Sequence, residues 1–242
     1  MALSERPPAS RAQRKALADL RRARVRRETG ELLVEGATLL DEALRAGCAP
    51  RVVAVTDAEA ERQGALLVRA AAAGARVLSL EPSQVDAIAD REHGPGLLAA
   101  VASPAAWDGS VPPDGPVLSV ALAGLQDPGN VGTLLRSARA FGVSGLWLLP
   151  GCADAYAPKV VRASAGAALH VPFCSLGEEA LGALPARAQA AGLTVLRAEA
   201  ARVAGAASSR ALPERCLLIL GHETRGVPAQ LAGESVSVPQ DP

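Results

Sequence analysis

The hydrophobic residues between positions 117 and 149 follow two different periods. Residues 117–123 and 146–149 form short continuous apolar runs, which are typical of strands buried on both faces of a sheet. Between these runs, apolar residues recur at helical spacing, namely at Val131, Leu134, Leu135, Ala138 and Phe141. Gly142 stands where a helix often ends in a left-handed residue. The pattern predicts a strand, a helix packed on the sheet and a second, parallel strand.

A polar turn precedes the predicted helix. It consists of Asp127, Pro128, Gly129 and Asn130. Open parallel sheets bind ligands at the carboxyl ends of their strands, where the first N–H groups of a helix are also free. We therefore expect a ligand site at this turn. Arg136 and Arg139, three residues apart, share a face of the helix away from its apolar stripe.

The rest of the second half alternates between the same two patterns. Helices are predicted at residues 156–168 and 178–191, and strands at 171–173, 193–197 and 216–220. The last strand runs into a second polar turn, residues 221–227, which contains two glycines. Alternating strands and helices predict a parallel sheet with helices on both faces.

The first half of the chain predicts a smaller α/β domain. Strands are expected at residues 31–35, 51–56, 76–80 and 96–102, and helices at 37–46, at 58–73 and from Pro82. Residues 103–116 are rich in proline and show little periodicity, so a linker is expected there. The predicted parts are a basic arm (1–27), a small α/β domain (28–102), the linker (103–116) and a parallel-sheet domain (117–242).

Composition excludes several classes of protein. Of the 242 residues, 49% are hydrophobic, which is ample for a core. No apolar run approaches the ~20 residues needed to span a bilayer, and the N-terminus is too polar for a signal peptide. We expect a cytoplasmic protein without a membrane partner. The four cysteines and three histidines do not cluster, which predicts neither a metal site nor a redox pair.

The neutral net charge hides an asymmetry along the chain. Residues 1–27 carry nine basic and two acidic side chains, a net charge of +7, so the remaining residues carry −7. A basic segment on an otherwise acidic protein favours a polyanion such as nucleic acid. The candidate contacts are Arg22, Arg24, Arg26 and Arg27. The alternative is a solvated helix that frays at the end of the chain.

Common nucleotide-binding and hydrolytic motifs are absent from the sequence. Residues 129–133 lack the lysine and the spacing of a phosphate-binding loop, and no GxGxxG follows a predicted strand. No spacing suggests a serine, histidine and acid combination, so hydrolysis has no candidate nucleophile. Only five aromatic residues occur, so base stacking is not expected to dominate the recognition of nucleic acid.

Three segments together resemble the SpoU-type RNA ribose 2′-O-methyltransferases of the SPOUT superfamily. The segment LQDPGNVGTLLRSARAFG, residues 125–142, is similar to the first motif of that family. The segment PGCADAYAPKVVRASAGAALHVPF, residues 150–173, is similar to the second. LILGHETRGV (218–227) and VSVPQ (236–240) are similar to the start of the third. Residues 28–102 resemble the substrate-binding domain often fused in front of these enzymes.

The resemblance implies a fold, a cofactor and a set of site residues. The second domain would be a trefoil-knot methyltransferase domain that binds S-adenosylmethionine within a homodimer, with ribosomal RNA as the expected substrate. Asn130 and Arg136 match the catalytic asparagine and arginine of the family. The residues implied in cofactor binding are Leu220, Gly221, Glu223, Gly226, Val238 and Gln240. Those implied in RNA binding, besides the arm, are Arg139, Lys159 and Arg162.

Simpler roles remain open for the two catalytic candidates. Asn130 is also typical of a helix N-cap, and Arg136 of a solvated helix arginine. If both act in catalysis, methyl transfer from a sulfonium to a ribose oxygen depends largely on positioning the reactants. A guanidinium rarely gives up its proton, so we expect Arg136 to stabilise the developing 2′ oxyanion or to hold the adjacent phosphate. Asn130 would hold the loop or the hydroxyl.

The third motif departs from the family pattern at two places. His222 stands where asparagine is frequent. In the family the motif continues into a Ser-Leu-Asn segment and a final helix, whereas this sequence stops at Pro242. We therefore expect an incomplete knot and an incomplete cofactor pocket in the chain as written. The alternative function is a non-catalytic RNA-binding protein on the same scaffold, which would bind RNA without turning over S-adenosylmethionine.

Overall fold

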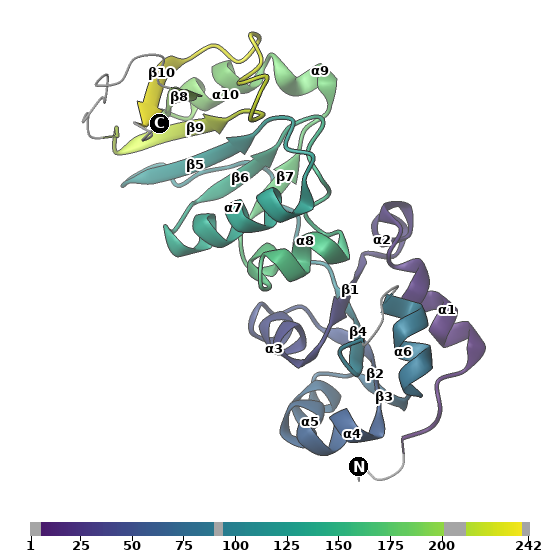
Figure 1. Ribbon diagram of the computed structural model, residues 1–242. Helices are drawn as coiled ribbons and strands as arrows, with labels where there is room; N and C mark the ends of the chain where they lie inside the picture. The colour runs from purple at the N-terminus through teal and green to yellow at the C-terminus, as the bar shows by residue number, and fades with distance from the viewer. Residues whose placement is uncertain (1–5, 90–93, 201–211, 239–242) are drawn as a thin grey trace. The chain divides into compact units, whose positions relative to one another are not determined.

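The computed structural model of the protein describes residues 6–89, 94–200 and 212–238. The chain divides into two compact units, each with its own sheet (Figure 1). The first unit comprises Met1–Ala105 and Asp154–His170, and the second comprises Ala106–Ala153 and Val171–Pro242. In the described part of the chain, every helix is too short or too polar to cross a membrane.

The first unit is built on a four-stranded mixed sheet with the strand order β1-β4-β2-β3. Its strands are β1 (Glu31–Glu35), β2 (Pro50–Val55), β3 (Arg76–Ser79) and β4 (Leu97–Ala102). β2 and β3 are parallel, whereas β4 runs antiparallel between β1 and β2. All four predicted strands of this domain are confirmed, with ends that differ by one residue at most.

Helices cover both faces of this sheet. They are α1 (Arg11–Asp19), α2 (Ala23–Thr29), α3 (Ala37–Arg45), α4 (Asp57–Arg62), α5 (Gly64–Ala72) and α6 (Pro82–Ala89). On one face α1 packs against α6, and Leu17, Leu33 and Ile88 share a buried cluster. On the other face α3 and α5 contact β1, β2 and β3 (Figure 1). A capping box between Ser10 and Gln13 begins α1.

Residues 154–170 fold as part of the first unit. They contain α8 (Pro158–Ala163), which packs on β1, and a short 3-10 helix, η1 (Ala167–Leu169). Ionisable side chains link this segment to α2, β1 and α3. The pairs are Arg26 with Asp154 (2.5 Å), Arg162 with Glu35 (2.7 Å) and His170 with Glu42 (2.8 Å).

The second unit contains a six-stranded parallel sheet with the strand order β10-β8-β9-β5-β6-β7. Its strands are β5 (Val117–Leu122), β6 (Gly145–Leu148), β7 (Phe173–Ser175), β8 (Thr194–Ala200), β9 (Arg215–Leu220) and β10 (Glu234–Val238). β5 pairs with β9 on one side and with β6 on the other. The predicted parallel sheet of this unit is confirmed.

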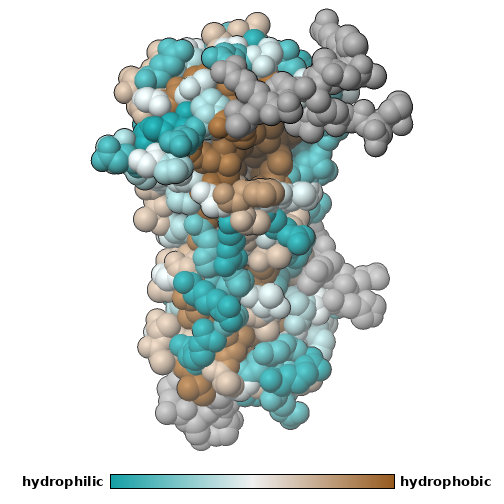
Figure 2. Space-filling model, turned by 90° about the vertical axis from the view of Figure 1, so that its left-hand side faces the viewer, coloured by the Kyte–Doolittle hydropathy of each residue, from teal (hydrophilic) through white to brown (hydrophobic). Residues whose placement is uncertain are grey.

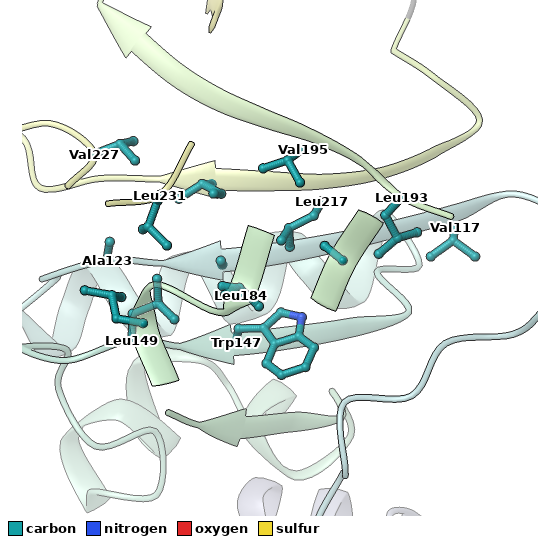
Figure 3. Close-up of a cluster of buried hydrophobic side chains, with 14 residues drawn as sticks. Val117, Ala123, Trp147, Leu149, Leu184, Leu193, Val195, Leu217, Val227 and Leu231 are labelled. Carbon is teal, nitrogen blue, oxygen red and sulfur yellow. The ribbon is translucent and has the colours of Figure 1, made fainter. Parts of the chain in front are cut away.

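Helices lie on both faces of the second sheet, as predicted. α7 (Pro128–Ala140) covers one face with the buried residues Val131, Leu135 and Ala138. α9 (Glu178–Leu181) and α10 (Leu184–Ala190) cover the other face. There, Trp147, Leu184 and Leu217 are part of the buried cluster in Figure 3. Phe141 departs from the predicted apolar stripe, because it follows the end of α7 and is 78% exposed.

Three predicted helices are interrupted in the structure. The helix predicted at 156–168 ends early because Ala165 (φ 48°) and Gly166 (φ 83°) take left-handed backbone conformations. The helices predicted at 58–73 and at 178–191 are each divided in two, as α4 and α5 and as α9 and α10. Apolar periodicity continues across these breaks, so the pattern alone does not reveal them.

The two ends of the chain differ from the prediction. Leu17 and Leu20 are buried, so most of the expected basic arm packs into the first unit and is not a detached extension. β10 is absent from the prediction, although its sequence alternates polar and apolar residues as strands do. The expected incomplete knot concerns the end of the chain, where residues 239–242 lie outside the described residues.

Arg26 provides a test of how α2 is held in the first unit. Its side chain is 5% exposed, and its guanidinium donates to the carbonyl oxygens of Leu20 (2.8 Å) and Arg21 (2.7 Å) and to Asp154. Arg26→Ala removes the charged donor from all three acceptors. We expect the free energy of unfolding to fall by roughly 1.5–3 kcal/mol, as measured by urea denaturation.

The matched control is Arg24→Ala on the same helix. Arg24 is exposed and pairs along the helix with Glu28, at 2.6 Å. Exposed pairs of this kind contribute about 0.3–0.5 kcal/mol. Equal losses of stability in the two variants would contradict a structural role for Arg26.

Candidate active site

Three loops converge at the carboxyl edge of the second sheet. They follow β5, β6 and β9, whose parallel directions bring their ends together. Backbone hydrogen bonds join the ends: the Ala123 N–H donates to the Leu220 carbonyl, and the Leu149 N–H donates to the Leu122 carbonyl, both at 2.9 Å. We call these loops, residues 123–127, 149–153 and 221–226, the carboxyl rim.

The loop after β9 is a closed turn. His222 and Gly226 exchange two backbone hydrogen bonds of 3.1 and 2.8 Å, and the Thr224 N–H donates to His222 Nδ1 at 3.2 Å. A Cβ on Gly221 would lie 2.2 Å from the carbonyl carbon of Gly226, so only glycine fits at this position. The turn therefore holds Glu223 at its exposed tip.

Asn130 and Glu223 meet across the carboxyl rim, although 93 residues separate them in the sequence. Asn130 Nδ2 donates to Glu223 Oε1 at 2.5 Å. The backbone N–H of Asn130 donates to the Asp127 carboxylate at 2.9 Å. Asp127 is therefore the N-cap of α7. The simpler interpretation of Asn130 as the N-cap is wrong, because its side chain is engaged elsewhere.

Arg136 and Arg139 lie further along α7, and both are exposed. Arg136 follows Asn130 by six residues, which corresponds to roughly 9 Å along the helix axis. Among the residues that the structure describes, Arg136 has no ion-pair or hydrogen-bond partner. Its guanidinium donors are therefore available to an anion outside the protein.

The remaining cofactor candidates lie at the same edge of the sheet or outside the described residues. Leu220 ends β9, and Gly226 closes the turn that follows it. Val238 ends β10, which β8 separates from β9 in the parallel sheet. Gln240 lies outside the described residues.

The candidate RNA contacts of the first unit fall into two groups. Four are exposed cations: Arg22, Arg24, Arg27 and Lys159. The other two are used inside the unit, because Arg26 is buried and Arg162 pairs with Glu35, whose side chain is 1% exposed. We therefore remove Arg26 and Arg162 from the candidate RNA contacts.

Cys152 is a neighbour of the carboxyl rim that sequence reasoning misses. Its Sγ lies 3.0 Å from the carbonyl oxygen of Leu122, within reach for S–H donation. Burial raises the pKa of this thiol, so it is protonated at neutral pH. A single cysteine without a spaced partner gives no signal in the sequence. In the structure, the neighbouring Gly151 packs closely on Gly124, because a Cβ on Gly151 would lie 3.3 Å from the Gly124 Cα.

A solved structure defines the class of fold. The chain resembles an rRNA methyltransferase from Sinorhizobium meliloti, whose crystal structure contains bound AdoMet, with a TM-score of 0.80 and 23% identity. The similarity covers 98% of this chain and 90% of that chain. The chain therefore shares the fold of that enzyme.

The sequence comparisons identify the family. Residues 117–241 match the SpoU rRNA Methylase family, and residues 12–99 match the MRM3-like substrate binding domain. The chain belongs to the SpoU rRNA methylase family. An uncharacterised tRNA/rRNA methyltransferase of Synechocystis is 31% identical over 231 residues, which cover 94% of this chain and 82% of the relative.

A shorter match concerns an enzyme whose name states its specificity. The 23S rRNA (guanosine(2553)-2′-O)-methyltransferase of Bacillus subtilis is 34% identical over 114 residues. The match covers 44% of this chain and 42% of the Bacillus enzyme. The similarity therefore extends over less than half of each protein.

Gly221→Ala tests the geometry of the turn. The new Cβ would overlap the backbone of Gly226, so the turn has to open. Overpacking of this kind costs about 1–3 kcal/mol, and we expect that loss in the free energy of unfolding. Gly182→Ala is the control, because its Cβ would have no neighbour within 4 Å. Urea denaturation compares the two, and an unaffected Gly221→Ala variant would contradict the observed turn.

Proposed function

We propose that this protein transfers a methyl group from S-adenosylmethionine to a ribose 2′-hydroxyl in RNA, with ribosomal RNA as the substrate. The observation that carries the proposal is the pairing of Asn130 with Glu223 on the carboxyl rim, next to the helix that carries the exposed Arg136. Membership of the SpoU family supports it. So do the AdoMet bound to the Sinorhizobium enzyme and the 2′-O specificity of the Bacillus enzyme.

The cofactor is proposed to lie on the carboxyl rim. Four rim residues are glycines, so no side chain at these positions keeps a ligand away from the backbone. The proposed contacts are Leu220, Gly221, Glu223, Gly226, Val238 and Gln240. S-adenosylmethionine supplies a methyl group on a positively charged sulfur, and the protein contributes chiefly by holding the ribose in line with it.

Arg136 is proposed to stabilise the negative charge that develops on the ribose 2′ oxygen. As the 2′ oxygen attacks, negative charge develops on it, and a fixed guanidinium donor stabilises that charge more in the transition state than in the ground state. The same planar donor group also suits a neighbouring phosphate. A guanidinium is a poor base, so the proposed role of Arg136 is that of a hydrogen-bond donor.

The RNA is proposed to contact exposed cations of both units. Those of the first unit are Arg22, Arg24, Arg27 and Lys159, and Arg139 on α7 belongs to the second. These side chains bind phosphates, so they add affinity without reading sequence. The MRM3-like substrate binding domain at residues 12–99 supports RNA binding by the first unit.

We also propose that the protein acts as a homodimer, as the family resemblance implies. Phe141 and Leu212 are 78% and 49% exposed, and both line a groove of about 300 Å³ in the second unit. Figure 2 shows hydrophobic residues gathered on one face of this unit. Exposed apolar surfaces of this kind are typical of protein interfaces.

Two measurements on the purified full chain test the proposed activity. Calorimetry should detect binding of S-adenosylmethionine, and incubation with ribosomal RNA and methyl-labelled cofactor should place label on a ribose 2′ oxygen. RNA binding without cofactor binding or methyl transfer would overturn the proposal. That result would favour the alternative, an RNA-binding protein without turnover.

Arg136→Ala tests the electrostatic role. Loss of a donor to a developing oxyanion lowers turnover by roughly 10²–10³-fold, and we expect a decrease of that size in kcat. The Kd for S-adenosylmethionine should barely change. Arg136→Lys should recover little, because a single ammonium replaces a planar group with several donors.

The control for this substitution is Arg139→Ala, one turn further along α7. As a proposed phosphate contact, Arg139 should affect the KM for RNA more than kcat. Full methylation by the Arg136→Ala variant would show that the assigned role is wrong.

The salt dependence of RNA binding tests the exposed cations of the first unit. We expect Arg22→Ala, Arg24→Ala and Arg27→Ala, combined in one chain, to weaken binding and to reduce the slope of log K against log salt by about one for each lost phosphate contact. Substitution is preferable to deletion of residues 1–27, because Leu17 and Leu20 are part of the core. An unchanged slope would remove these three arginines from the interface.

A further inference from the structure

The side chain of Asn130 is an amide with two chemically different ends. Its Nδ2 donates hydrogen bonds, and its Oδ1 only accepts them. A carboxylate only accepts, so the end that meets Glu223 must be Nδ2. The hydrogen bond of 2.5 Å therefore fixes which end of the amide turns away from Glu223. That end is Oδ1.

We propose that Glu223 is a positioning residue that orients the amide of Asn130, so that Oδ1 accepts the hydrogen bond of the ribose 2′-hydroxyl. The inference rests on the proposed function and gives one of its site residues a specific task. Without the carboxylate, nothing holds Oδ1 toward the hydroxyl, and the amide is free to present Nδ2 instead. An Nδ2 donor would bind a lone pair of the hydroxyl oxygen and so lower the nucleophilicity of that oxygen.

The backbone around both residues is fixed independently of their contact. Asn130 is held in the first turn of α7, because its N–H donates to Asp127 at 2.9 Å. Glu223 is held in the turn that His222 and Gly226 close with two hydrogen bonds. Since each backbone is held by hydrogen bonds of its own, the hydrogen bond between the side chains can set the orientation of the Asn130 amide.

The orientation of the Asn130 amide determines how the 2′ oxygen can attack the methyl group. With Oδ1 accepting from the 2′-hydroxyl, an oxygen lone pair is left to attack the methyl carbon. The O–C bond forms while the C–S bond breaks with its electron pair on sulfur, which cancels the sulfonium charge. The 2′ proton passes to solvent water. Asn130 and Glu223 keep their protonation states, so the carboxylate acts by orientation and not as the base.

The test exchanges the two functional groups. Glu223→Ala removes the acceptor and leaves the Asn130 amide without its partner. Asn130→Asp replaces the donor by a carboxylate, so that two carboxylates face each other. The double variant Asn130→Asp with Glu223→Gln again pairs a donor with an acceptor, but with the donor at position 223 and the acceptor at position 130. In the double variant, the new amide at position 223 donates to one oxygen of the new carboxylate at position 130. The other oxygen of that carboxylate remains to accept from the ribose.

We expect Glu223→Ala to lower kcat by roughly 10–100-fold, the range for a lost hydrogen bond to a charged group, with little change in the KM for RNA. Asn130→Asp should be nearly inactive at pH 8 and should gain activity on acidification, as a proton comes to bridge the two carboxylates. The double variant should recover activity at pH 8. A purely structural role would not produce this rescue or this pH dependence.

A readout other than activity separates this inference from the proposed function. In the NMR spectrum of the wild-type protein, one side-chain amide proton of Asn130 should be shifted downfield, and Glu223→Ala should remove the shift. If that shift is present but no RNA is methylated, the proposed function fails and the orientation of Asn130 stands. An active wild type whose kcat and amide shift are unchanged by Glu223→Ala would overturn the positioning role.

Discussion

Parallel strand pairing in the second unit is the constraint on which the candidate site depends. Because β9, β5 and β6 run in the same direction, Leu220, Leu122 and Leu148 end in register at one edge. The loops that follow these strands must therefore share that edge. Residues 130 and 223 come within hydrogen-bond distance only because of this pairing. The glycine at 221 then allows the last loop to close tightly enough to present a carboxylate.

The first unit uses charge in a different way. Arg26 and Arg162 look like surface cations in the sequence, yet their guanidinium groups satisfy carbonyl and carboxylate oxygens inside the unit. A planar group with five donors suits such a task better than a lysine. The pairs of Arg26 with Asp154, Arg162 with Glu35 and His170 with Glu42 hold residues 154–170 within the first unit. The positive charge that remains for a polyanion is smaller than the composition indicates.

The sequence predicts those features that local patterns encode. The parallel sheet, the helix from Val131 to Ala138 and the two polar turns follow from apolar periodicity and glycine placement, and the structure contains each of them. The breaks at Ala165 and Gly166 do not follow, because a left-handed backbone is a tertiary outcome. The sequence gives no sign of the bond between Arg26 and Asp154 or of the bond between Asn130 and Glu223, since the partners lie 128 and 93 positions apart.

Hydrogen exchange of the full chain with and without S-adenosylmethionine tests the central claim, that the carboxyl rim holds the cofactor. We expect protection at residues 123–130, 149–153 and 221–227, where the three loops meet. The second unit has another hollow, of about 530 Å³, lined by Gly109, Arg187 and Arg215 among others. Protection confined to that hollow, with the rim unchanged, would contradict the claim.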